Sequence, residues 1–155
     1  MRMSVLAFAA AGTMAALAAS CAEAPPPPNS SPVPALSAYD GTYPHDTQIQ
    51  PQFLDHPLVR GAVEQVVGDA AVRQRVLDPA GPKTPIWIAG DRIHSWGCEQ
   101  HRCGPHNWTI SMKLDGSEPE VCYHRADTTE SGATWYLAGH TEIRDFHCPS
   151  EQADG

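Results

Sequence analysis

Residues 107–114 read NWTISMKL and form the clearest β-strand pattern in the chain. Apolar and polar side chains alternate along this segment, with Trp108, Ile110, Met112 and Leu114 on one side and Thr109, Ser111 and Lys113 on the other. A period of two places the apolar set on one face of a sheet, so the segment predicts a strand with one buried and one solvated face.

Further strand patterns lie on both sides of this segment. PIWIA (85–89) and RIHSWG (92–97) flank a Gly90-Asp91 turn and predict a β-hairpin. On the other side, a turn at Asp115-Gly116 leads to three more segments that predict strands: EVCYHR (120–125), ATWYLAG (133–139) and HTEIRDFHCP (140–149).

Two amphipathic helices are predicted before the strands. In LDHPLVRGAVEQVVG (54–68), Asp55 is the expected N-cap, Pro57 lies in the first turn and Gly68 is the expected stop. Asp69 is the expected cap of a second helix at residues 70–77. The arginines of these segments are interpreted as solvated helix surface: Arg60, Arg73 and Arg75. Two helices followed by about five antiparallel strands predict one α+β domain, with the helices packed on the sheet.

The N-terminal third predicts export. Residues 1–20 combine Arg2 with an Ala-rich apolar run that is too short to span a bilayer and suits a signal peptide. The run ends in AASC, which is similar to a lipoprotein signal with Cys21 as the lipidated residue; cleavage after Ala24 is the alternative. Residues 21–38 are rich in Pro and Ser and predict an extended linker, so the folded domain is expected at 39–155. We therefore expect a periplasmic lipoprotein, with the outer membrane favoured because residue 22 is not Asp.

The charge balance restricts the partners. The 155 residues include 18 Asp plus Glu against 10 Lys plus Arg, a formal net charge of −8. Such a chain repels the phosphate backbone, so no nucleic acid partner is expected. An acidic surface attracts cationic proteins, although many proteins are acidic for solubility alone.

The cysteines favour disulfides. If Cys21 is lipidated, four cysteines remain, an even number that suits an exported protein and permits three pairings. Their short separation between two strands favours a bond between Cys98 and Cys103, which leaves Cys122 for Cys148. This pairing would display His101 at the tip of a protruding, disulfide-closed loop.

A zinc site is the chemical alternative for the same segment. Its pattern, C-x2-H-x-C-x2-H, consists of four residues of types that bind zinc: Cys98, His101, Cys103 and His106. Structural zinc sites usually join two separated ligand pairs, whereas these four residues fall within nine positions, and oxidation removes both thiolates. We expect no cofactor, and zinc binding stays an alternative.

Several segments together carry a resemblance to a known family. CEQHRC (98–103) followed by Gly104, the hairpin at 86–97, CYH (122–124) and TWYL (134–137) resemble the Ivy family, bacterial inhibitors of vertebrate, c-type lysozyme. The likeness covers Phe53 to Cys148. In that family the loop reads C-K-P-H-D-C, is closed by a disulfide, and inserts its histidine between the catalytic carboxylates of the enzyme.

The resemblance implies roles for the loop residues. Cys98 and Cys103 match the disulfide and His101 matches the inhibitory histidine, while three family residues are replaced by Glu99, Gln100 and Arg102. His106 is expected as a secondary contact with the partner.

The expected function is inhibition and not catalysis. The expected partners are c-type lysozyme or a lytic transglycosylase, together with the membrane through a lipid anchor at Cys21. A non-inhibitory structural or interaction lipoprotein of the cell envelope with the same fold is the alternative function. The oligomeric state stays open, a homodimer included.

Overall fold

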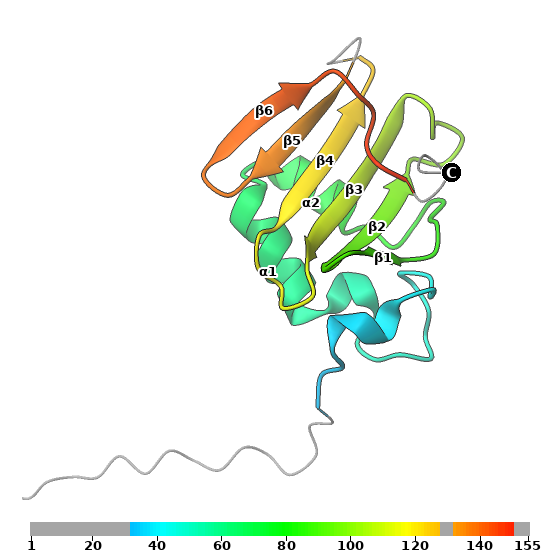
Figure 1. Ribbon diagram of the computed structural model, residues 1–155. Helices are drawn as coiled ribbons and strands as arrows, with labels where there is room; N and C mark the ends of the chain where they lie inside the picture. Colours follow the sequence, from blue (N-terminus) through cyan, green and yellow to red (C-terminus); the bar gives the residue numbers. More distant parts are fainter. Residues whose placement is uncertain (1–31, 128–131, 151–155) are drawn as a thin grey trace, which may run out of the picture. The chain divides into compact units, whose positions relative to one another are not determined.

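The computed structural model describes residues 32–127 and 132–150 (Figure 1). The expected signal peptide, the lipidation site Cys21 and the first part of the expected linker lie outside these residues. The helical elements are η1 (Leu36–Tyr39), η2 (Phe53–Asp55), α1 (Pro57–Val66) and α2 (Ala70–Val76). The strands are β1 (Trp87–Ala89), β2 (Arg92–Cys98), β3 (His106–Lys113), β4 (Glu120–Arg125), β5 (Ala133–Leu137) and β6 (His140–Arg144).

The strands form one antiparallel sheet in the order β1-β2-β3-β4-β5-β6, so each strand pairs with its neighbour in the sequence. The predicted α+β class with an antiparallel sheet is confirmed. The described sheet has six strands and not about five, because residues 140–144 pair with β5 along their whole length. The rest of the predicted last strand does not continue the sheet.

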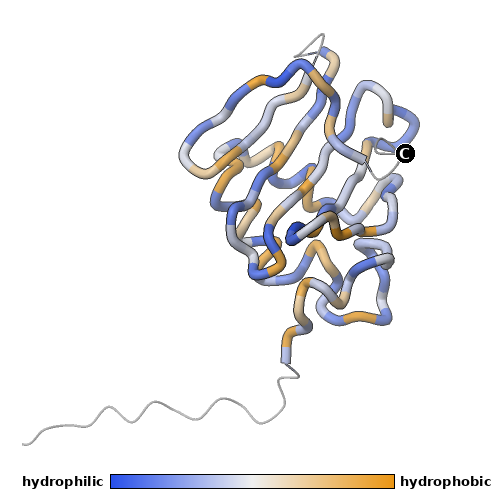
Figure 2. Tube along the Cα trace, viewed as in Figure 1, coloured by the Kyte–Doolittle hydropathy of each residue, from blue (hydrophilic) through white to orange (hydrophobic). Residues whose placement is uncertain are grey.

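The helices cover one face of the sheet (Figure 1). Hydrophobic and hydrophilic residues follow one another along the helices and strands in Figure 2, as expected for elements that bury one face. The core between the two layers is fully buried and is formed mainly by Val59, Val63, Val67, Val76, Ile93, Ile110, Met112 and Val121.

The start of α1 differs from the prediction. The N-cap is His56 and not Asp55: the His56 Nδ1 atom accepts a hydrogen bond from the Leu58 N–H at 3.1 Å. Asp55 lies in η2, where its carboxylate pairs with Arg60. An imidazole acceptor at the cap thus replaces the carboxylate that the usual N-cap preference favours. Asp69 caps α2 as predicted, accepting from the two N–H groups of Ala71 and Val72.

Ordered structure begins before residue 39, inside the segment expected as a linker. Leu36 and Tyr39 are both buried, and the Tyr39 ring packs edge-on against Phe53 with centroids 5.5 Å apart. The Tyr39 hydroxyl donates to the Pro51 carbonyl at 2.6 Å. Leu36, inside the expected linker, and Tyr39, the first residue of the expected domain, thus both complete the core and bind the end of the Pro-rich segment to the domain.

Residues 145–150, which we name the C-terminal strap, cross the sheet face opposite the helices (Figure 1). A disulfide joins Cys148 to Cys122 of β4, and the Thr109 hydroxyl donates to the Pro149 carbonyl at 2.6 Å. Thr109 is therefore buried, with 2% of its surface exposed, and Ser111, which accepts a hydrogen bond from Arg92, is 5% exposed. The prediction of a half-solvated strand at 107–114 is wrong for these two residues, because the strap and Arg92 cover them.

Across residues 32–127 and 132–150, no helix has both the length and the apolar character needed to cross a bilayer.

Candidate functional site

The connection between β2 and β3 is closed by a disulfide between Cys98 and Cys103, with the two Cα atoms 4.8 Å apart. Together with the Cys122–Cys148 bond, this is the pairing that the sequence favours. Both thiolates of the alternative zinc site are consumed by this bond. Within the described parts of the chain, no group of three or more His, Cys, Asp and Glu side chains could hold a metal ion.

Backbone hydrogen bonds fix the shape of the closed loop. The Arg102 N–H donates to the Glu99 carbonyl at 2.9 Å, and the His106 N–H donates to the Arg102 carbonyl at 2.8 Å. The Asn107 side-chain amide donates to the Cys103 carbonyl at 2.9 Å. With the disulfide, these bonds leave the loop little conformational freedom to lose when it binds.

A neighbouring segment supports the base of the loop. The Cys98 N–H donates to the Pro82 carbonyl at 3.1 Å. Gly81 adopts a φ of +84°, and a Cβ atom there would lie 2.6 Å from the Cys98 carbonyl oxygen. Only glycine fits at this position, because any side chain would both strain the backbone and push on the loop.

His101 lies at the turn of the loop and is exposed. Its φ is +63°, a left-handed conformation that is uncommon outside glycine, asparagine and aspartate, although histidine tolerates it better than most residues. In the described structure no other group bonds its imidazole ring. Both ring nitrogens are therefore available to a partner.

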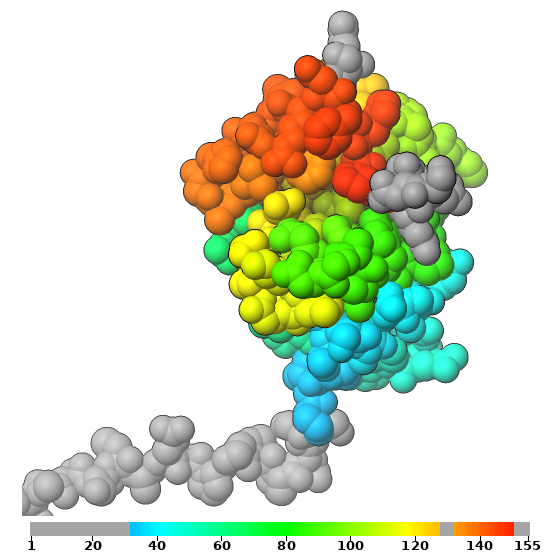
Figure 3. All heavy atoms as spheres, in the orientation of Figure 1, coloured from blue at the N-terminus to red at the C-terminus, as the bar shows by residue number. Residues whose placement is uncertain are grey.

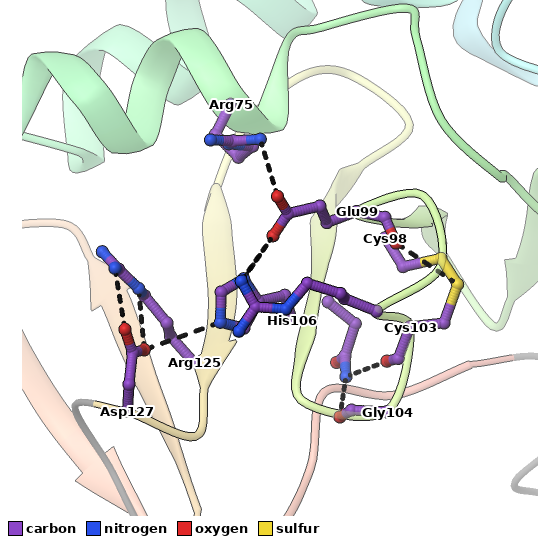
Figure 4. Close-up of polar contacts among 10 residues, drawn as sticks. Arg75, Cys98, Glu99, Cys103, Gly104, His106, Arg125 and Asp127 are labelled. Atoms are coloured by element: carbon purple, nitrogen blue, oxygen red, sulfur yellow. Dashed lines mark hydrogen bonds and ion pairs between the residues drawn. A yellow bond between two sulfur atoms is a disulfide. The ribbon is translucent and has the colours of Figure 1, made fainter.

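The Glu99 carboxylate turns back onto its own domain (Figure 4). It is hydrogen-bonded to Nδ1 of His106, and its oxygens lie 3.8 Å from an Nη of Arg75 and 3.7 Å from an Nη of Arg102. The hydrogen bond from His106 lowers the pKa of the Glu99 carboxyl, and the positive charges of His106, Arg102 and Arg75 lower it further. Glu99 thus carries its charge into an internal ion-pair network and not toward a partner.

His106 lies between two carboxylates of this network. Its side chain is only 9% exposed, with Nδ1 on Glu99 and Nε2 3.6 Å from Oδ1 of Asp127. Arg125 completes the network by pairing with Asp127 at 2.8 Å. The role of His106 as a secondary contact stays a prediction; in the structure its ring is buried and hydrogen-bonded to Glu99.

Arg75 is a member of the site that sequence reasoning missed. The arginine extends from α2 toward Glu99, and its side chain is 47% exposed (Figure 4). The sequence interpretation of Arg75 as solvated helix surface omits this contact. No local pattern could have revealed it, because Arg75 lies on α2 and Glu99 follows β2, and only the folded chain brings the two side chains together.

Two exposed arginines, Arg75 and Arg102, accompany His101 at the loop. We name the exposed side chains of Arg75, His101 and Arg102 the loop patch; half of the Arg102 side chain is exposed. In a protein with a net charge of −8, this patch carries two arginine guanidiniums, whose charges Glu99 compensates in part. It is suited to pair with carboxylates of another molecule.

Comparisons with protein-family models, with curated proteins and with solved structures give no match. The functional argument therefore depends on the geometry of the loop.

Proposed function

We propose that the protein inhibits c-type lysozyme, or a related glycosidase that cleaves peptidoglycan, by inserting the disulfide-closed loop into the catalytic cleft. The observation that supports this proposal best is the exposed imidazole of His101 at the turn of a fixed loop. No chemical step is required, since inhibition follows from occupying the cleft.

The chemistry of the target explains why a histidine is suitable. Glycosidases of this type use two carboxyl groups on either side of the scissile bond. A protonated imidazole can donate one hydrogen bond from each ring nitrogen, and adjacent carboxylates favour that charged form. Arg102 lies next to His101 and supplies a second cation to the same cleft.

The inward turn of Glu99 removes an obstacle to this docking. A carboxylate that projected beside His101 would repel the carboxylates of the enzyme. In the structure its charge is instead compensated by His106, Arg75 and Arg102. The loop can therefore present cations, although its sequence carries an acidic residue.

Hydrolysis of peptidoglycan by hen c-type lysozyme tests the proposal directly. We expect saturable inhibition by the purified protein and at least about a tenfold loss with His101→Ala, because a central contact group is removed. Gln100→Ala is the matched control, since Gln100 is the exposed neighbour in the same loop, and should inhibit almost as well as the unchanged protein.

The other outcomes of this assay are equally informative. Inhibition that survives His101→Ala would show that the loop is not the inhibitory element. If c-type lysozyme is unaffected but a lytic transglycosylase is inhibited through His101, the mechanism stands and the target changes. Inhibition of neither enzyme would favour the non-inhibitory envelope lipoprotein.

We further propose that the chain is exported and lipidated at Cys21. Metabolic labelling with a radioactive fatty acid should mark the unchanged protein and not Cys21→Ala. Label retained in the variant would exclude this anchor.

A further inference from the structure

A cavity of about 200 Å³ lies on the sheet face that the C-terminal strap crosses. Its lining includes Arg92, Thr109, Ser111, Glu120, Trp135 and Arg144. None of these residues belongs to the loop patch. Figure 3 views the molecule from this side, with the green atoms of β2, the yellow atoms of β4 and the orange-red atoms of β6 on the same surface.

The strand register explains why these polar groups converge. Ser111 of β3 pairs with Glu120 of β4, and in the next row Thr109 pairs with Cys122, which in turn pairs with Trp135 of β5. Because these positions share one face of the sheet, side chains far apart in the sequence line one hollow.

The lining combines a mainly apolar surface with a few polar side chains. Thr109 and Ser111 are buried, and Arg92 donates from Nε to the Ser111 hydroxyl at 3.1 Å. A mostly apolar lining with a few placed polar groups is typical of sites for small molecules, in which the polar groups fix the orientation of the ligand. A volume of 200 Å³ is below the range of roughly 300–1,000 Å³ for drug-sized ligands, so it suits only a small molecule.

Two residues of the lining, Trp135 and Arg144, carry hydrogen-bond donors without a partner among the described residues. The Arg144 guanidinium stacks over the Trp135 ring at 4.2 Å and donates through Nε to Glu142 at 2.6 Å. Within residues 32–127 and 132–150, its two terminal nitrogens have no hydrogen-bond partner, and the buried Trp135 Nε1–H has no acceptor. Glu120 is the acidic group of the lining, and it already lies 3.6 Å from Arg92.

We infer that this cavity binds a small organic anion, about the size of an amino acid, whose carboxylate pairs with Arg144. The planar guanidinium matches a carboxylate in geometry as well as in charge, and its stacking on Trp135 holds it in a fixed orientation. The ligand carboxylate supplies acceptors for the unpartnered donors of Arg144 and Trp135. This inference does not rest on the proposed lysozyme inhibition.

Titration of the 15N-labelled full-length protein with N-acetylglycine, followed by NMR, tests the inference. The indole N–H resonance of Trp135, assigned with Trp135→Phe, should shift saturably at millimolar probe. The methyl ester of the same probe is neutral and should bind at least about tenfold more weakly, because it offers no charge to the guanidinium.

Two variants complete the experiment. Arg144→Gln should weaken N-acetylglycine binding by at least about tenfold, whereas Arg60→Gln on α1 should leave it unchanged. The proposal is overturned if the probe causes no saturable shift, if the ester binds equally well, or if Arg144→Gln binds as the unchanged protein does. Inhibition of lysozyme by Arg144→Gln should be unaffected, which distinguishes this site from the loop.

Discussion

At the scale of single residues, His101 combines exposure with a backbone conformation that glycine adopts more easily. With φ at +63°, this residue stores a small strain at the turn of the loop. His101→Gly should relieve that strain and raise the free energy of unfolding by about 0.5–1 kcal/mol, after subtraction of the larger entropy of glycine in the unfolded chain. The same variant should lose inhibition. Urea unfolding and the lysozyme assay measure the two effects.

Gln100→Gly is the matched control for this prediction. Gln100 has no positive φ, so glycine there should lower the free energy of unfolding by about 0.5–1 kcal/mol. If both glycine variants are destabilised equally, His101 is not strained.

The ionisation of Glu99 makes the stability of the folded protein depend on pH. Its pKa is lowered in the folded protein, mainly by the hydrogen bond from His106, so its contribution to stability is fully present above the usual pKa of a glutamate. That contribution is lost as the pH falls through the lowered folded-state pKa. Glu99→Gln should therefore have a lower melting temperature than the unchanged protein at neutral pH. Thermal melts from about pH 7 to about pH 3 should show the difference shrinking in acid. A constant difference at every pH would exclude this linkage.

The sequence predicted the disulfide-closed loop of the site but not the ion pairs around it. The spacing of the cysteines indicates the closed loop with His101 at its turn, because both features depend on six consecutive residues. The partners of Glu99 could not be predicted, because Arg75 and His106 reach it only after α2 and β3 have packed. Long-range ion pairs leave no periodic trace in a sequence.

At the scale of elements, the periodicity of the sequence predicted the strands and helices. It did not predict which faces of the sheet other segments cover. The alternation at 107–114 correctly identifies β3, yet both of its faces are buried. The second face is covered by the strap and Arg92, and the strap reaches that position through the disulfide at Cys148. A period of two in the sequence predicts which side chains share a face of the sheet. It does not predict which other segment covers that face.

The two disulfides should therefore have different consequences. By the loop-entropy relation, the Cys122–Cys148 bond, with a separation of 26, should stabilise folding by about 3.5 kcal/mol, and the Cys98–Cys103 bond, with a separation of 5, by about 2 kcal/mol. Replacing both cysteines of the longer bond with alanine should lower stability more but leave inhibition nearly intact at low temperature. Replacing Cys98 and Cys103 should cost less stability but weaken inhibition strongly. The reverse pattern in unfolding and inhibition assays would contradict the assignment of the short bond to loop shape.

At the scale of the whole molecule, the net charge of the chain is negative, whereas the exposed charged side chains of the loop patch are positive. The chain as a whole is acidic, with a net charge of −8, while the loop patch exposes Arg75, Arg102 and His101. A strongly basic c-type lysozyme would be attracted by the overall field, and its catalytic carboxylates would then meet the local cations. The long-range charge acts on the rate of encounter, whereas the local charge acts on the lifetime of the complex.

These two contributions can be separated kinetically. Glu64→Lys on α1 reverses an exposed charge outside the loop patch, so it should lower the association rate with c-type lysozyme by roughly two- to fivefold at low salt and leave the dissociation rate unchanged. Arg102→Gln should instead raise the dissociation rate, because it removes a cation that would contact the cleft.

Surface-plasmon resonance at low and high salt measures both rates. The association rates of the unchanged protein and of Glu64→Lys should converge at high salt, since screening shortens the range of the field to a few ångströms. An association rate that does not respond to salt would show that the acidic surface serves solubility and not encounter with a basic enzyme.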